Sequence, residues 1–172
     1  MTKTDVAYCL AKIGQAEPDW KTLVVEGSRS SAVPVEQLWA TWIDLESWPS
    51  WSPIHRSVKL VDARPLSVGS SFDQELELGF PVGVQHERAR FDEFEPQARA
   101  SWSGDKNGVR SCHVWRFEPT PGGGTHVHNV EIFVGTTIGL VKSLVAKRWN
   151  GLFQAAVDGL IAAAGADRGQ RT

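Results

Sequence analysis

The stretch His113–Gly135, HVWRFEPTPGGGTHVHNVEIFVG, decides the fold. Two runs rich in apolar and aromatic residues flank Thr120–Gly124, TPGGG, where proline and glycine favour a tight reversal of the chain. Directly after Gly135 the apolar residues change to a spacing of three and four, which is typical of a helix. The stretch therefore predicts an antiparallel hairpin that leads into a helix.

The predicted helix runs from about Thr136 to Ala164 and is the longest element, roughly 40 Å at about 1.5 Å per residue. One side of it is polar, with Lys147, Asn150, Gln154 and Asp158. The other side is an apolar stripe formed by Ile138, Val141, Val145, Trp149, Leu152, Ala156 and Leu160. We expect this stripe to pack against the concave face of a sheet, with Trp149 and Leu152 buried there.

Residues 58–134, which include the hairpin, are also divided by turn signals at Gly79–Gly83 and Asn107–Gly108. Apolar and polar residues alternate between these turns, so about six short strands in hairpin succession are expected. Residues 21–31 favour a first strand. Pro34 then suits the first turn of a short helix, and a second helical turn is expected at Leu45–Trp51.

The order is a strand, two short helices, six strands and a long helix. It predicts an α+β domain in which a curved antiparallel sheet wraps around the C-terminal helix. This domain is expected to span residues 21–165. Residues 1–20 are interpreted as an N-terminal extension with weak helical spacing, and residues 166–172 as a flexible tail.

Four stretches appear in this order: Val33–Trp39, Trp48–Pro53, His113–Pro119 and Gly124–Ile132. Together they resemble the START-related SRPBCC superfamily over about residues 21–165. The individual motifs are similar to those of its polyketide cyclase/dehydrase branch. The resemblance implies the helix-grip fold, with an internal cavity between the sheet and the last helix that is entered near the short helices. It implies less about activity, because the superfamily includes lipid carriers, hormone-binding proteins, aromatases and cyclases.

Composition restricts the possible partners. The 172 residues, 41% of them hydrophobic, suit one domain. Lysine and arginine (18) nearly balance aspartate and glutamate (20), so no nucleic-acid partner is expected. No apolar run is long enough for membrane insertion, and a cytoplasmic monomer or homodimer is expected. In a reducing compartment Cys9 and Cys112 are expected to be free thiols. No cofactor is expected, since Gly122–Gly124 lacks the lysine of a phosphate-binding loop.

Aromatic residues dominate the expected pocket, with eight tryptophans and seven phenylalanines in the chain. Trp48 and Trp51, stiffened by nearby prolines, are expected either to gate the cavity or to cap the core. The predicted ligand contacts are Trp48, Trp51, Phe72, Leu76, Trp102, Trp115, Phe117, Val130, Ile132, Val145, Trp149 and Leu152.

Histidines supply the candidate chemistry. If the hairpin turn centres near Pro121 and Gly122, Trp115 lies opposite His128, and His113 becomes a diagonal neighbour of His128 on the cavity wall. Both are then candidate acid/base catalysts. Two alternatives stay open. The histidines could simply be hydrogen-bonded core residues, or His126 and His128 could hold zinc, although no further ligand is placed to complete a metal site.

Three functions compete. The first is a carrier or sensor of a small apolar or aromatic molecule, lipid- or polyketide-like. The second is a polyketide cyclase or aromatase that uses a cavity histidine as general acid/base, with Arg88 or Arg90 as donor to an enolate oxygen if a bulge before Phe91 turns one of them inward. The third is an interaction module, suggested by the N-terminal extension and the surplus of tryptophan.

Overall fold

The computed structural model describes residues 3–166 of the chain. The expected tail at 166–172 lies outside the described residues, except for Ala166, where the last helix ends. The elements are α1 (Lys3–Lys12), β1 (Thr22–Ser31), α2 (Val35–Trp42), the 3-10 helix η1 (Leu45–Ser50), β2 (His55–Leu60), β3 (Ser71–Glu77), β4 (Val84–Glu95), β5 (Arg99–Lys106), β6 (Val109–Pro119), β7 (Thr125–Val134) and α3 (Thr136–Ala166). From β1 onward the predicted order is confirmed.

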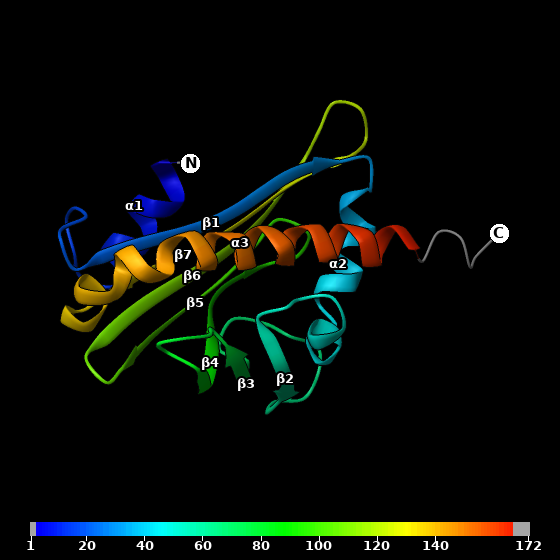
Figure 1. The fold of residues 1–172 in the computed structure, drawn as a ribbon. Coiled ribbons are helices and arrows are strands. Elements are labelled where there is room, and N and C mark those ends of the chain that lie inside the picture. The colour runs from blue at the N-terminus through cyan, green and yellow to red at the C-terminus, as the bar shows by residue number, and fades with distance from the viewer. Residues whose placement is uncertain (1–2, 167–172) are drawn as a thin grey trace.

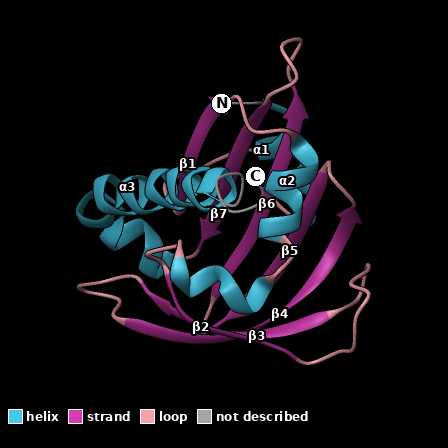
Figure 2. Cartoon of the chain, turned by 90° about the vertical axis from the view of Figure 1, so that its right-hand side faces the viewer, coloured by secondary structure: helices cyan, strands magenta, loops and turns pink. Residues whose placement is uncertain are grey.

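The seven strands form one antiparallel sheet in the order β1-β7-β6-β5-β4-β3-β2. The sheet curves around α3, which lies along its concave face (Figures 1 and 2). The predicted turn at Asn107 and Gly108 joins β5 to β6, and both residues have positive φ, as a two-residue hairpin turn of this kind requires. The irregularity in β4 lies between Phe91 and Glu93, after Phe91 and not before it as expected, so it does not turn Arg88 or Arg90 inward. The predicted helix-grip architecture is therefore confirmed.

α3 packs on the sheet through a stripe that differs from the predicted one at a single turn. Trp149 is buried as expected, but Leu152 is only half-buried, and the fully buried side chain there is Phe153. β1 approaches the helix so closely that a Cβ on Gly27 would lie 2.5 Å from the backbone oxygen of Phe153. The polar side chain of Asn150 accepts a hydrogen bond from the backbone N–H of Glu26 on this edge strand, at 3.0 Å.

α1 lies on the outer, convex face of the sheet, opposite α3 (Figure 2). A disulfide joins Cys9 of α1 to Cys112 of β6, so the expectation of two free thiols is wrong. The expectation failed because it rested on an assumed reducing compartment and not on the distance between the two residues. Around the disulfide an apolar cluster is buried, formed by Leu10, Ile13, Val114, Val130, Ile132 and Val134.

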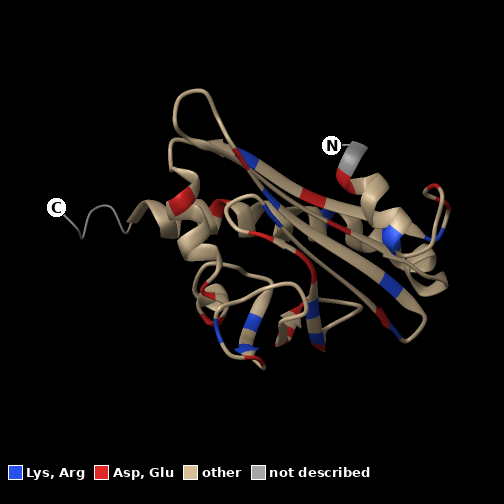
Figure 3. Ribbon diagram, turned by 180° about the vertical axis from the view of Figure 1, so that it is seen from behind, with Lys and Arg blue, Asp and Glu red and all other residues tan. Residues whose placement is uncertain are grey.

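Charged residues of both signs are interspersed along the strands and their connections (Figure 3). Among residues 3–166, no helix has the length and apolar character needed to cross a membrane.

Candidate functional site

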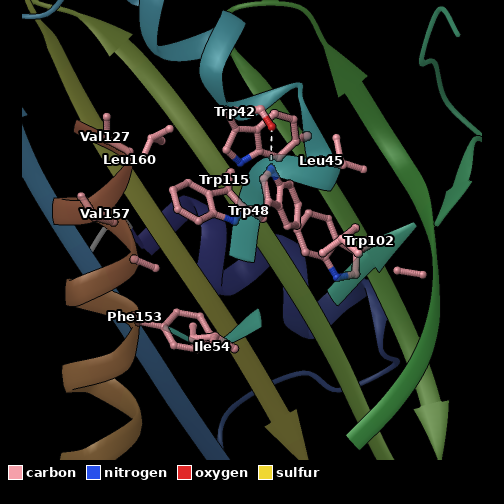
Figure 4. Close-up of a cluster of buried hydrophobic side chains, with 14 of the residues drawn as sticks. Trp42, Leu45, Trp48, Ile54, Trp102, Trp115, Val127, Phe153, Val157 and Leu160 are labelled. Carbon is pink, nitrogen blue, oxygen red and sulfur yellow. Dashed lines mark hydrogen bonds between the residues drawn. The ribbon is translucent and has the colours of Figure 1, made fainter. Parts of the chain in front are cut away.

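Aromatic side chains fill one end of the space between the sheet and α3. Trp48 donates its indole N–H to the backbone oxygen of Trp42 at 2.6 Å, and its ring lies 6.0 Å from that of Trp102 (Figure 4). Trp115 and Phe117 stack nearby, 6.3 Å apart. Most of the tryptophans and phenylalanines predicted as ligand contacts belong to this packed cluster, namely Trp48, Trp51, Phe72, Trp102, Trp115 and Phe117.

A cavity of about 200 Å³ lies at the other end, beneath the first half of α3. It is bounded by the turns after β3 and β5, and not by the short helices near which the resemblance implied an entrance. Its apolar lining includes Leu76, Leu78, Val82, Phe133, Val141, Trp149 and Phe153. Of the predicted ligand contacts, Leu76 and Trp149 line this cavity, whereas Val145 is buried in the core beside it.

A row of polar side chains crosses the concave face and forms one wall of the cavity. Strand pairing builds the row, because Gln74 of β3 is opposite Glu87 of β4, and His113 of β6 is opposite Glu131 of β7. His55 of β2 extends it at one edge. Side chains directly opposite on one face of an antiparallel pair lie next to each other, so the row is continuous between these partners.

His113 is held by polar contacts on both sides of its ring. Its Nε2 atom lies 2.5 Å from Oδ1 of Asn129, and its Nδ1 atom lies 3.3 Å from Oε2 of Glu131. The ring also packs against Trp102 and Phe153, with centroids 4.3 and 5.3 Å away. Burial lowers the pKa of His113 to about 3 and raises the pKa of Glu131 well above its ordinary value.

These contacts define the proton positions of the pair. The amide oxygen of Asn129 only accepts, so Nε2 of His113 carries the ring proton and Nδ1 presents its lone pair to Glu131. The raised pKa of Glu131 favours a protonated carboxyl beside that lone pair. A neutral base and a neutral acid in contact can exchange a proton with a bound molecule without creating an isolated buried charge.

The second half of the row has the same chemical character. Gln74 donates from Nε2 to Oε2 of Glu87 at 3.2 Å, and burial raises the pKa of Glu87. His55 contacts Ser52, with 2.8 Å between Nδ1 and the hydroxyl oxygen, and burial lowers the pKa of His55 to about 4. Burial thus favours the neutral form of each ionisable group in this wall.

The predicted register of the hairpin is wrong by one residue. Trp115 pairs with Asn129 and not with His128, which instead lies opposite Arg116. His128, Val130 and Ile132 consequently point to the convex face, away from the cavity. His128 lies there beneath α1, its Nδ1 atom 3.2 Å from Asp5 and its Nε2 atom 3.3 Å from Glu26.

The two arginines considered as donors also face away from the cavity. Arg88 forms an ion pair with Asp73 at 2.7 Å, and Arg90 donates to the backbone oxygen of Gly69 at 3.1 Å. Ala89 and Phe91 point to the inner face of β4 and are buried. Arg88 and Arg90 alternate with them along the strand and therefore point to the outer face. Within residues 3–166, no three His, Cys, Asp or Glu side chains are grouped as metal ligands.

The sequence analysis missed Gln74, Glu87, Asn129 and Glu131 as site residues. The parity of each strand contained the signal, since Phe72 and Gln74, or Val127 and Glu131, share a face. A polar residue on an otherwise apolar strand face is informative because an unpaired buried polar group is costly.

Comparison with solved structures yields proteins of the same fold. TTHA0849 from Thermus thermophilus has a TM-score of 0.70 at 19% identity, covering 84% of this chain and 99% of that one. The Zhui aromatase/cyclase from a Streptomyces species has a TM-score of 0.67 at 13% identity, covering 84% and 94%. A norcoclaurine synthase from Thalictrum flavum has a TM-score of 0.64 at 14% identity, covering 86% and 96%. At these identities the likeness establishes the fold alone.

A comparison with curated protein sequences finds no significant match. The sequence profile described as polyketide cyclase / dehydrase and lipid transport, in contrast, matches residues 22–165. Because this match covers all the strands and nearly all of α3, the chain belongs to the polyketide cyclase / dehydrase and lipid transport family.

Proposed function

We propose that the chain binds a small, largely apolar or aromatic molecule, lipid- or polyketide-like, in the cavity beneath α3. One observation carries the proposal: a cavity of about 200 Å³ combines an apolar lining with polar side chains converging from one wall. Small-molecule sites generally have this composition, in which apolar surface supplies affinity and a few polar groups orient the ligand. Leu76 and Trp149 are the proposed apolar contacts, and His113 the central polar one.

A change of cavity volume tests the proposal. Val141→Phe introduces a ring into the lining, whereas Ala155→Phe introduces the same ring on the exposed side of α3. A neutral aromatic probe such as indole, titrated by calorimetry, is expected to bind the wild type and the Ala155→Phe variant equally. In Val141→Phe its affinity should fall about tenfold or more, equivalent to about 1.4 kcal/mol. Equal affinity in all three proteins would place binding outside the cavity.

A second candidate function is acid/base catalysis of the cyclase or aromatase kind. The contact between His113 and Glu131 favours it, because enolisation and dehydration of a poly-carbonyl chain need both a proton acceptor and a proton donor. Incubation with a poly-carbonyl test substrate, followed by analysis of the products, distinguishes an enzyme from a carrier. Product formation identical to that without protein would contradict the catalytic candidate for that substrate.

The partners and the cellular location of the chain are predictions made from the sequence. A monomer or homodimer without nucleic-acid partner, membrane insertion or cofactor is expected from composition. The cytoplasmic location expected from the sequence is opposed by the Cys9–Cys112 disulfide, since such bonds persist mainly in oxidising compartments. Trapping of free thiols in freshly lysed cells would test it, because reduced cysteines react and the disulfide does not.

A further inference from the structure

Three hydrogen-bond acceptors converge on the polar wall of the cavity: the carboxyls of Glu87 and Glu131, and the amide oxygen of Gln74. Gln74 is 5% exposed, and its Nε2 already donates to Glu87. Its Oε1 atom is buried and accepts no hydrogen bond of normal geometry from the described residues, and the imidazole of His55, which interacts with the Gln74 side chain, is the neighbouring donor. A buried acceptor without a donor is costly, so a ligand that supplies donors at this place is favoured.

Apart from one lysine, the groups of this wall that can carry a charge at neutral pH are carboxyls, and their charge is negative. His55 and His113 are neutral, since burial lowers both pKa values. Lys106 is the one cationic side chain among the described residues that line the cavity; it is exposed, at the end of β5, and donates to the backbone oxygen of His86. A ligand carboxylate or phosphate would therefore meet two carboxyl groups and no buried cation.

We infer that the ligand carries a protonated primary amine, whose ammonium group lies between Glu87, Glu131 and Oε1 of Gln74. The inference rests on the proposed function and names the chemical class of its ligand. An ammonium group has three donors and no acceptor, which matches three converging acceptors. The apolar remainder of the ligand then lies against Val141 and Trp149 of α3.

Binding of such a ligand moves a proton. Burial raises the pKa of both carboxyls, the negative charge that Glu87 carries when it is ionised raises that of Glu131 further, and the charge of Lys106 acts in the opposite direction on Glu87. A bound ammonium acts in the opposite direction, because an adjacent positive charge favours the ionised carboxylate. The amine enters already protonated, one carboxyl releases its proton to the buffer, and the complex holds a carboxylate–ammonium pair.

The size of the cavity limits the probes. A dry cavity of about 150 Å³ takes up benzene, so about 200 Å³ accommodates one ring with a short chain. Three compounds carry a phenyl ring on a two-carbon chain with a different polar group: an ammonium in 2-phenylethylamine, a hydroxyl in 2-phenylethanol, and in phenylacetate a carboxylate that includes the second chain carbon. Titration calorimetry at pH 7, in two buffers of different ionisation enthalpy, measures both affinity and proton release.

The amine is expected to bind at least about tenfold more tightly than the alcohol, and phenylacetate most weakly. The heat of amine binding should depend on the buffer, by up to one released proton, while the heat of alcohol binding should not. Glu131→Gln and Glu87→Gln should each reduce the advantage of the amine over the alcohol. The matched control Glu95→Gln, at an exposed position of β4, should retain it.

Circular dichroism establishes that each variant is folded, and if one of the two cavity variants does not fold, the other carries the test. Alcohol binding as tight as amine binding would overturn the inference and leave the proposed function intact. An amine advantage that survives in the folded Gln variants would overturn it as well. Failure of all three compounds to bind the folded wild type would overturn both.

Discussion

The imidazole Nε2 of His113 lies 2.5 Å from Oδ1 of Asn129. The two residues belong to the neighbouring strands β6 and β7, and both side chains are on the face of the sheet that α3 covers. This contact fixes the tautomer of a neutral histidine, because an amide oxygen accepts and never donates. The other ring nitrogen is thereby available to Glu131 and to the cavity. The acid/base character of the site thus depends on a residue that does not itself line the cavity.

Replacement of Asn129 with leucine should destabilise the fold by about 1–3 kcal/mol, the cost of a buried donor without a partner. The double variant Asn129→Leu, His113→Phe should recover part of that loss, since both polar partners are then gone. Urea unfolding of the wild type, both single variants and the double variant measures the coupling. Strictly additive effects would contradict the hydrogen bond between the two side chains.

Glu131 predicts a dependence of stability on pH. Its carboxyl titrates near 4.5 when unfolded and at higher pH when folded, so the folded state holds a proton that the unfolded state releases. The stability due to the neutral form is complete below about pH 4.5 and is lost as pH rises toward the folded pKa. His113 has the opposite effect below about pH 6.5, because only the unfolded imidazole gains a proton there.

Comparison of the wild type with Glu131→Gln separates the effect of the Glu131 carboxyl on stability from that of His113, because only the carboxyl is removed. The unfolding free energy of this variant, relative to wild type, should increase as pH rises from about 5 to about 8. The gain should be at most about tenfold in the unfolding equilibrium constant per pH unit. The exposed variant Glu95→Gln should show no such trend. A difference between Glu131→Gln and wild type that stays constant with pH would indicate that Glu131 ionises normally in the folded state.

Phe153 and Leu152 are adjacent on α3 but differ in burial. Phe153 is 2% exposed and contacts His113, whereas Leu152 is half-buried. Phe153→Ala is expected to cost about 3–5 kcal/mol, and Leu152→Ala clearly less, because the buried position that the sequence predicted for Leu152 is occupied by Phe153. Thermal or urea unfolding of the two variants ranks them. A larger loss for Leu152→Ala would mean that the helix presents a different face to the sheet.

The order of the elements could be predicted because each depends on local signals. The period of the apolar residues changes at Gly135, and the turn residues Asn107 and Gly108 have the positive φ that their types favour. The number of strands followed from such signals, as did the turns that join β3 to β4, β5 to β6 and β6 to β7. The inner and outer faces of β7 could not be assigned in this way, because both of its faces are buried.

α1 is the physical reason for that ambiguity. It covers the convex face over β6 and β7, so outward residues such as Val130 and Ile132 are as apolar as a core requires. The predicted register assumed a turn centred between Pro121 and Gly122, whereas the pairing of Pro119 with Thr125 centres it on Gly122, and two apolar faces gave no sign of the one-residue slip. The same helix buries Asp5 with Arg116 and His128, an ionic group that no local pattern indicates.

The disulfide that fastens α1 is expected to stabilise the domain. Cys9 and Cys112 are 103 residues apart in sequence, so the bond closes a long loop. The double variant Cys9→Ala, Cys112→Ala should lose about 2–5 kcal/mol of unfolding free energy. Dithiothreitol should lower the urea midpoint of the wild type and leave that of the double variant unchanged. An insensitive wild type would show that the bond contributes nothing to stability.

His113 and His128 provide a matched pair for the final prediction, since they lie on neighbouring strands but on opposite faces of the sheet. His113→Gln removes the neutral base beside Glu131, whereas His128→Gln alters only the contacts beneath α1. If the chain is an enzyme, His113→Gln should lower turnover about 10²-fold or more, the usual contribution of a positioned proton-transfer group, and His128→Gln should leave it close to wild type. If it is a carrier, His113→Gln should weaken ligand binding by about 0.5–1.5 kcal/mol, as for one hydrogen bond.

Turnover or affinity measured for both variants separates these cases. A greater loss in His128→Gln than in His113→Gln would place the chemistry on the convex face and contradict the site described beneath α3.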